Sequence, residues 1–158
     1  MDKLTIRKTT KDDISKVMPL IEKLNLSDFP YDEQVNVKWG ETEKGKEYYY
    51  KKIDGTKGVC FLAEIDNEPI GYVMGEIEEA DGYRTIRVVE LSNIYVKEQF
   101  RNQGIGKKLV DAFLDWGKEI GAQKASVSAF TQNAKAMQFY EHEGFKNYST
   151  RFEISLEK

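Results

Sequence analysis

The sequence predicts one α+β domain, and three observations lead to this fold class. The chain has 158 residues, a length that suits one hydrophobic core. Segments with alternating apolar residues are interspersed with segments in which apolar residues recur every three or four positions, as strands and helices require. Neither a repeat nor a low-complexity linker separates them, and 40% of the residues are apolar. We therefore expect a single globular domain over residues 1–158.

The elements of the first half follow from these two periods and from turn residues. Leu4 and Ile6 alternate with polar neighbours in the first strand, and Pro19 is expected to kink the first helix. A second helix lies in the aromatic-rich segment 25–53, but the pattern does not define its start. The predicted elements are a strand at 3–8, a helix at 12–25, that second helix, and strands at 58–65 and 69–78 that form an antiparallel hairpin around Asp66-Asn67-Glu68.

The second half begins with a long strand at 84–96, after a turn at Asp81-Gly82. Apolar residues at spacings of three and four then indicate a helix from Ile105 that ends at Gly121. A strand at 123–130 and a helix from about Ala134 complete this part.

Composition excludes several classes of protein. One cysteine, Cys60, and one histidine, His142, assemble neither a disulfide nor a Cys/His zinc site, so no metal is expected. Cys60 lies in an apolar run, which favours a buried structural thiol. The net charge of −3 argues against nonspecific nucleic-acid binding. No apolar stretch resembles a membrane span or a secretory signal, so the expected location is cytoplasmic, without a membrane partner.

A glycine-bearing turn joins the long strand to the helix that follows it. Gly104 and Gly106 allow close approach to the backbone, and a helix amino terminus favours an anion through its free amides and its dipole. Arg101, Lys107 and Lys108 add positive charge. The turn therefore predicts a phosphate or pyrophosphate site, although two glycines that only ease helix packing remain an alternative.

The spacing excludes two familiar nucleotide motifs. A Walker loop requires four residues between its first glycine and the Gly-Lys pair, and then Ser or Thr; Gly104-Ile105-Gly106-Lys107-Lys108 has neither. A dinucleotide fingerprint requires a third glycine where Leu109 stands and an acid where Lys124 stands. Another phosphate-bearing ligand is needed.

Two motifs together carry a family resemblance. Arg101-x-x-Gly104-x-Gly106 follows a strand that ends in Ile94-Tyr95-Val96, and Asn133-x-x-Ala136-x-x-Phe139-Tyr140-Glu141-x-x-Gly144-Phe145 comes later. Over roughly residues 58–145 the chain resembles the GNAT superfamily of N-acetyltransferases. The resemblance implies an α/β/α sandwich around a mixed, mostly antiparallel sheet that is splayed between its fourth and fifth strands. It also implies a final strand after the last helix. Glu141-His142-Glu143 departs from the basic residue and leucine that the family often has.

The resemblance also implies acetyl-CoA as co-substrate. Backbone groups of Ile94, Tyr95 and Val96 would pair with the pantetheine arm, and Asn133 would hydrogen-bond the cofactor. Tyr140 would protonate the departing thiolate as general acid and would also contact the cofactor. A helix cap and a core tyrosine are the structural alternatives for these two residues. The pyrophosphate would bind the turn that Arg101 opens, at Asn102, Gln103, Gly104, Ile105, Gly106 and Lys107.

Glu90 is the candidate base that would deprotonate the amine. An alkylammonium group has no lone pair with which to attack a thioester, so its proton must be removed first. A period of two would place Glu90 on the apolar stripe that runs from Ile86 to Val96, where burial would raise its pKa. It also lies eleven residues before Arg101, where some histone-type members of the superfamily place a catalytic glutamate. A surface glutamate, a salt-bridge partner and a water relay in its place are the alternatives.

The acceptor is inferred from charge. Residues 58–83 contain seven acids and neither Lys nor Arg, a charge that would attract a small cationic amine such as a polyamine or an aminoglycoside; a merely solvated acidic surface is the alternative. Tyr31, Trp39 and Tyr48 to Tyr50 are candidate walls of the acceptor pocket, or core residues. Acetylation of a protein amino terminus or lysine is an alternative, and a noncatalytic acyl-CoA sensor is a second. A homodimer is compatible with the resemblance.

Overall fold

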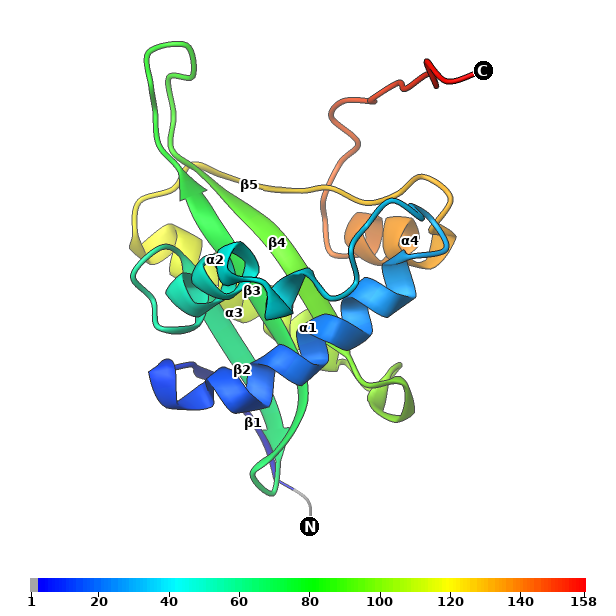
Figure 1. Cartoon of the computed structure of the whole chain (residues 1–158). Coiled ribbons are helices and arrows are strands. Elements are labelled where there is room, and N and C mark those ends of the chain that lie inside the picture. The colour runs from blue at the N-terminus through cyan, green and yellow to red at the C-terminus, as the bar shows by residue number, and fades with distance from the viewer. Residues whose placement is uncertain (1–2) are drawn as a thin grey trace. The chain divides into compact units, whose positions relative to one another are not determined.

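A five-stranded sheet organises the larger part of the molecule (Figure 1). The computed structural model describes residues 3–158. The chain divides into two compact units, Met1–Ser128 and Ala129–Lys158, and the sheet belongs to the first.

The strands lie in the sheet in their order along the chain, β1-β2-β3-β4-β5. Neighbouring strands are antiparallel except β4 and β5, which are parallel. The predicted mixed, mostly antiparallel sheet is therefore confirmed. The strands are β1 (Leu4–Lys8), β2 (Val59–Ile65), β3 (Glu68–Glu78), β4 (Val88–Val96) and β5 (Lys124–Val127).

Helices cover both faces of this sheet, as an α/β/α sandwich requires. In Figure 1, α1 and α2 lie on one face and α3 lies on the other. Pro19 is inside α1, as expected, and the second helix begins after the N-cap Thr42, whose hydroxyl accepts from the Gly45 amide. The helices are α1 (Ile14–Asp28), α2 (Glu43–Ile53), α3 (Ile105–Glu119) and α4 (Ala134–His142), the last in the second unit, with short 3-10 turns at Lys11–Asp13, Trp39–Glu41 and Glu98–Phe100.

Each face of the sheet has its own apolar core. On the α1/α2 face, fully buried Ile21, Tyr72 and Met74 pack in one cluster. On the α3 face, a Cβ at Gly75 would lie 2.4 Å from the Phe113 ring and 2.3 Å from the carbonyl oxygen of Glu90, so only glycine fits there. Burial of these side chains supplies most of the stabilisation of the sandwich.

The β2–β3 hairpin is tighter than the sequence predicts. Asp66 and Asn67 have φ of 50° and 66°, the pair of positive values that a type I′ turn requires, and Glu68 already belongs to β3. Asp and Asn tolerate this conformation better than most residues.

Two strand predictions are wrong in extent. The long strand begins at Val88 instead of residue 84, because the pairing with β3 ends at Glu78 opposite Val88. Before it, the Arg84 amide donates to the Asp81 carboxylate at 2.8 Å and closes a turn instead of a ladder. β5 is likewise shorter than the predicted strand at 123–130.

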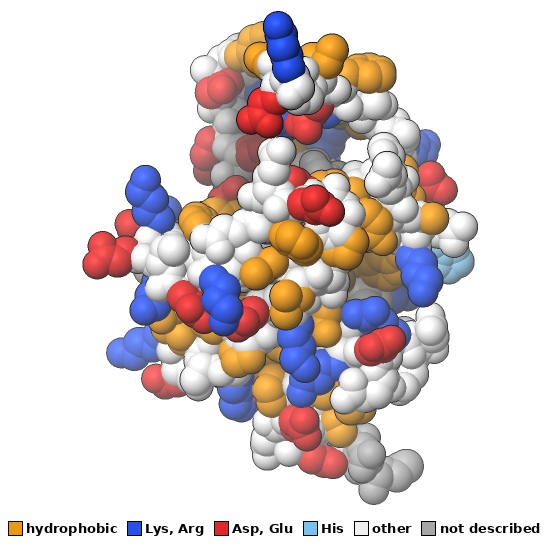
Figure 2. All heavy atoms as spheres, turned by 45° about the vertical axis from the view of Figure 1, so that its right-hand side comes forward, with side chains coloured by type: hydrophobic (Ala, Val, Ile, Leu, Met, Phe, Trp, Pro, Cys, Tyr) orange, Lys and Arg blue, Asp and Glu red, His pale blue; other side chains and the backbone are white. Residues whose placement is uncertain are grey.

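The final strand that the resemblance implies is absent, since residues 143–158 contain none. Their apolar side chains Phe152, Ile154 and Leu156 are 90%, 86% and 93% exposed, so no packing holds this segment in a sheet. Across residues 3–158, every helix is too short or too polar to span a lipid bilayer. Both signs of charge are mixed over the face that Figure 2 shows.

Candidate functional site

Strand β4 is paired on both sides over only half of its length. Its parallel register with β5 runs from Val88 opposite Lys124 to Leu91 opposite Val127 and stops there. The half from Asn93 to Val96 continues to pair with β3, but no strand of the described residues pairs with its other edge. This confirms the predicted splay between the fourth and fifth strands, and it leaves a strand edge to which an extended ligand can add.

A β-bulge at Ser92 separates the two halves. Leu91 lies opposite Gly75 and Asn93 lies opposite Met74, so Ser92 is an extra residue without a partner on β3. The bulge reverses the alternation of side chains: Tyr95 lies opposite Tyr72 and packs against the α1/α2 core. Within residues 3–158, the buried hydroxyl oxygen of Ser92 has no hydrogen-bond partner.

The predicted apolar stripe along β4 is therefore wrong beyond Ser92. A period of two would place Glu90, Ile94 and Val96 on one face, but the extra residue moves Ile94 and Val96 to the α3 face. Glu90 stays on the α1/α2 face, where it lies opposite Glu76.

The glycine turn has the backbone conformation that an anion site needs. Gly104 is the N-cap of α3 with φ 78°, a left-handed value, although a Cβ there would meet no atom within 4 Å. The first helical hydrogen bond runs from the Lys108 amide to the Gly104 carbonyl at 3.1 Å. Helix geometry leaves the preceding amides without an intrahelical acceptor. Asn102 also has a left-handed φ, of 61°, which the sequence analysis missed although asparagine adopts it more readily than most residues.

Arg101 ties this turn to the end of β4. Its Nε donates to the Val96 carbonyl at 2.8 Å, and its guanidinium carbon lies 5.4 Å from the centre of the Tyr95 ring. Lys107, in the first turn of α3, forms an ion pair with Asp111 at 3.0 Å. The positive charge at the turn is therefore partly engaged by the protein itself.

Two carboxylates, Glu76 and Glu78, lie beside Glu90. Glu76 lies directly opposite on β3, and Glu78, two residues further along, shares a hydrogen bond with the Glu90 carboxyl group. Burial, that hydrogen bond and the negative charges of Glu78 and Glu76 raise the pKa of Glu90, against the opposing effect of Lys52. Glu90 is therefore more basic than an ordinary surface carboxylate.

Lys52 is the cation of this cluster, and it is not among the residues predicted from the sequence. Its side chain is only 3% exposed, and its Nζ lies 3.0 Å from Glu76 Oε2 and 3.4 Å from the centre of the Tyr48 ring. Tyr48 and Lys52 are four residues apart in α2 and so share a helix face, which is the signal that a sequence offers for such a pair.

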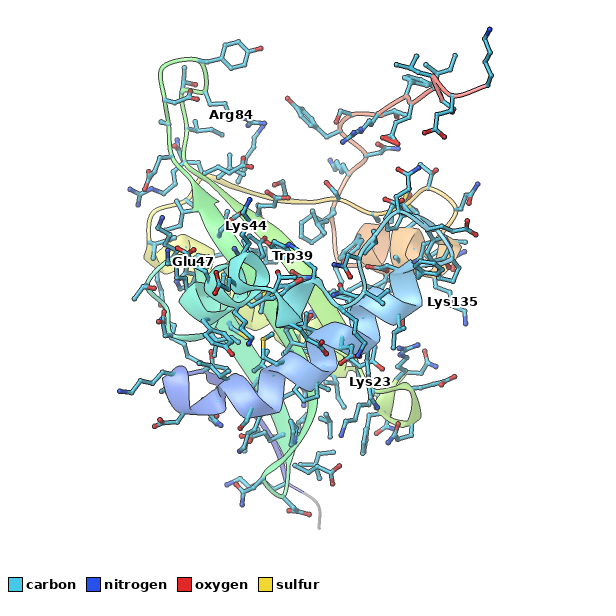
Figure 3. The ribbon with its side chains drawn as sticks, viewed as in Figure 1. Lys23, Trp39, Lys44, Glu47, Arg84 and Lys135 are labelled. Carbon is cyan, nitrogen blue, oxygen red and sulfur yellow. The ribbon has the colours of Figure 1, made fainter. Side chains whose placement is uncertain are left out.

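A pocket of about 330 Å³ adjoins this cluster and shares Lys52 and Glu76 with it. Its aromatic wall is Trp39 and Tyr48, whose ring centres are 5.4 Å apart. Tyr49, by contrast, is 5% exposed and belongs to the core. The aromatic residues of this segment therefore fill both predicted roles, that of pocket wall and that of core residue. In Figure 3, Trp39, Lys44 and Glu47 lie at α2 and the turn before it. The other lining residues are Lys51 and Lys57.

The second unit carries Asn133 and Tyr140. Asn133 caps α4, because its Oδ1 accepts from the Ala136 amide at 3.2 Å. The Tyr140 ring lies 5.3 Å from the Phe139 ring and 5.8 Å from the Phe145 ring, between centres. Gly144, with φ 95°, allows the turn after the helix. The cofactor and catalytic roles of Asn133 and Tyr140 stay predictions.

Cys60 has the structural role that the sequence favours. It is 1% exposed in the α1/α2 core, and burial raises the pKa of its thiol to about 12. A thiol that stays protonated at neutral pH is a poor nucleophile.

Comparison with known proteins places the chain in a family. Residues 20–145 match the model of the Acetyltransferase (GNAT) family. The chain belongs to this family, and its class is that of the N-acetyltransferases, which confirms the resemblance carried by the two motifs.

Relatives in several organisms are similar to it. A Methanocaldococcus jannaschii protein that carries the name uncharacterized N-acetyltransferase is 26% identical over 90% of this chain, which spans 60% of that relative's length. An Archaeoglobus fulgidus protein, also named an uncharacterized N-acetyltransferase, is 27% identical over 87% of this chain and 89% of its own length. An N-alpha-acetyltransferase of Sulfurisphaera tokodaii is 28% identical, with 63% of each chain covered.

Solved structures share the fold. An aminoglycoside N-acetyltransferase in complex with CoA has a TM-score of 0.77 at 20% identity, covering 98% of this chain and 95% of its own. A tetramutant of a Bacillus halodurans protein has a TM-score of 0.82 at 19% identity, covering 96% and 99%.

Proposed function

We propose that this chain is a single N-acetyltransferase domain that transfers an acetyl group from acetyl-CoA directly to a primary amine. The observation that carries this proposal is the division of β4 at Ser92. Before the bulge, the strand bears a carboxylate of raised pKa; after it, the strand has an unpaired edge that leads straight into the glycine turn. The candidate base and the strand edge proposed to bind the cofactor thus follow one another on a single strand.

Acetyl-CoA would bind along the second half of β4. The backbone at Ile94, Tyr95 and Val96 would pair with the pantetheine amides, and the turn from Asn102 to Lys107 would hold the pyrophosphate with its amides. Arg101 would act chiefly by shaping this turn, because its Nε is already bonded to Val96. Asn133 would contribute its amide NH₂ group, since its Oδ1 caps α4.

The reaction needs one base and one acid. Glu90 would accept a proton from the substrate ammonium, and the free amine would then attack the thioester carbonyl carbon. The raised pKa of Glu90 reduces the difference in pKa between its carboxyl group and an alkylammonium group, and this favours the proton transfer. The C–S bond breaks as the amide forms; the Tyr140 hydroxyl would protonate the departing thiolate, and the resulting phenolate would take up the proton that the amide nitrogen releases. Neither a metal nor a covalent enzyme intermediate is part of this scheme.

The acceptor that we propose is a small cationic molecule such as a polyamine or an aminoglycoside. Glu76, Glu78 and Glu90 present three carboxylates against one lysine, so the cluster attracts cations. An aminoglycoside acetyltransferase shares the fold, which supports the scaffold without specifying the acceptor.

A second acceptor class, the amino terminus or a lysine of a protein, is favoured by the adjoining pocket. Lys44, Lys51 and Lys57 line it beside Trp39 and Tyr48, a combination that suits a peptide with acidic and apolar side chains. The similar Sulfurisphaera protein carries the name N-alpha-acetyltransferase.

The test is thiol release from acetyl-CoA with a panel of amines that contains spermidine, aminoglycosides, and acidic and basic peptides. Release with the small cations supports the first class, and release with acidic peptides alone overturns it in favour of the second. Binding of CoA without release for any amine would contradict the enzyme proposal and indicate a sensor.

With the best amine, Glu90→Gln should lower kcat/KM about 100-fold or more. Glu79→Gln, an exposed carboxylate paired with Arg87, is the matched control and should leave the rate near wild type.

A further inference from the structure

We propose that Lys52 is a positioning residue for acetyl transfer: its buried ammonium holds Glu76 in place and keeps Glu90 able to ionise. This inference rests on the proposed role of Glu90 as base. Lys52 lies in the last turn of α2, outside both motifs of the family.

The contacts of Lys52 define one position for its charge. Its Nζ is 3.0 Å from Glu76 Oε2 and 3.4 Å from the centre of the Tyr48 ring, and the side chain is 3% exposed. A buried ammonium group requires compensation, which a carboxylate and an aromatic face both provide. The end of α2, with its negative dipole, favours a cation as well. The ammonium is therefore fixed beside the strand instead of extending into solvent.

The sheet register brings that fixed charge to Glu90. Glu76 and Glu90 are directly opposed residues of β3 and β4, and directly opposed side chains are neighbours on one face of a sheet. Glu78 on β3 also faces Glu90 through a hydrogen bond. On β5 the residue opposite Glu90 is Ser126, which does not titrate, and Lys124 lies one pleat away opposite Val88. Lys52 is the cation that α2 supplies to this group of carboxylates.

The charges around Glu90 predict opposite effects for the two members of the Lys52–Glu76 pair. Without Lys52, Glu90 would ionise beside two carboxylates and no buried cation, so its proton would be held more tightly. Without the charge of Glu76, the Lys52 ammonium would act on Glu90 undiminished, so the proton would leave more easily. A purely structural ion pair would give the same response to either change, namely lower stability.

The experiment measures kcat/KM against pH with the most active amine of the panel. Lys52→Met, which keeps the length and apolar stem of the side chain, should move the lower-pH limb of the profile upward by about one pH unit. Lys52→Arg retains the charge and should stay close to wild type. Glu76→Gln, which still accepts a hydrogen bond from Lys52, should move the limb downward. Lys118→Met is the matched control, because Lys118 is an exposed helical lysine that pairs with Asp115 on α3 and does not line the pocket.

The outcomes separate this inference from the proposed function. If Glu90→Gln leaves the lower-pH limb unchanged, the base role fails, and the role of Lys52 fails with it. If Glu90→Gln abolishes the limb while Lys52→Met and Glu76→Gln leave it in place or move it in the same direction, only the Lys52 inference is wrong. Should Lys52→Met not fold, the downward shift in Glu76→Gln decides the question.

Discussion

Two charged clusters lie on the α1/α2 face at opposite ends of the sheet, and they differ in charge balance. The first joins β1, α1 and β2: Arg7 contacts Asp13 at 2.7 Å and Glu64 at 2.8 Å, and Lys16 contacts Glu64 at 2.6 Å. The second, around Glu90, has three carboxylates and one buried lysine. The first cluster is neutral and the second carries a surplus of negative charge.

The pKa values of the carboxyl groups in the two clusters follow this difference in charge balance. The hydrogen bond from Arg7 lowers the pKa of Asp13 to about 2. Burial acts to raise the pKa of Glu64, but the hydrogen bonds from Arg7 and Lys16 outweigh it, and the net direction is downward. Around Glu90, burial and like charges raise the pKa instead. A balanced cluster therefore serves stability, whereas an unbalanced one keeps a carboxylate ready to take a proton.

The largest expected effect on stability comes from breaking the balanced cluster. Glu64→Leu removes a carboxylate whose side chain is 4% exposed and leaves Arg7 and Lys16 without their shared partner. We expect a loss of about 3 kcal/mol in the free energy of unfolding, measured by denaturant titration. Glu47→Gln, which breaks an exposed ion pair with Lys51, should leave the free energy of unfolding close to that of the wild type. Equal losses of unfolding free energy in the two variants would contradict a structural role for the first cluster.

A smaller effect concerns acid stability. Because the pKa of Asp13 is lower in the folded chain than in the unfolded chain, its contribution is present at neutral pH and is lost as the pH falls toward 2. We expect about 2 kcal/mol to disappear between about pH 4 and pH 2. The comparison is the unfolding free energy of wild type and Asp13→Asn against pH. The two curves should converge in acid, and a constant separation would contradict the assignment.

The smallest effect on stability is expected for Glu90→Gln. Since the pKa of Glu90 is raised in the folded chain, its ionisation opposes folding at neutral pH, and the amide removes that cost. Thermal unfolding should show a small gain in stability that shrinks as the pH falls. Loss of activity with gain of stability would distinguish this cluster from the first, and a clear loss of stability would place Glu90 among the structural carboxylates.

The predictions that succeeded rest on local signals. The hairpin between β2 and β3, the start of a helix at Ile105 and the burial of Cys60 each follow from residue types together with their immediate neighbours. The family resemblance rests on motifs of the same kind, and the match over residues 20–145 confirms it.

The predictions that failed require knowledge of a partner strand. A period of two along β4 has no way to show that Ser92 is an extra residue, because a bulge exists only relative to the register of β3. The prediction of a strand after the last helix fails for a related reason. An alternating pattern makes a segment suitable for a strand, but a strand forms only where the edge of a sheet is available to pair with it.

The sequence by itself determined the order of strands and helices, the glycine turn before α3 and the family, since these depend on residues close together in the chain. Only the tertiary structure decided which carboxylate meets which cation. Lys52 and Glu76 are 24 residues apart, and Arg7 and Glu64 are 57 apart. Whether the pKa of a glutamate is lowered, as in a stabilising ion pair, or raised, as a base requires, depends on the charges that folding brings within a few ångströms of it.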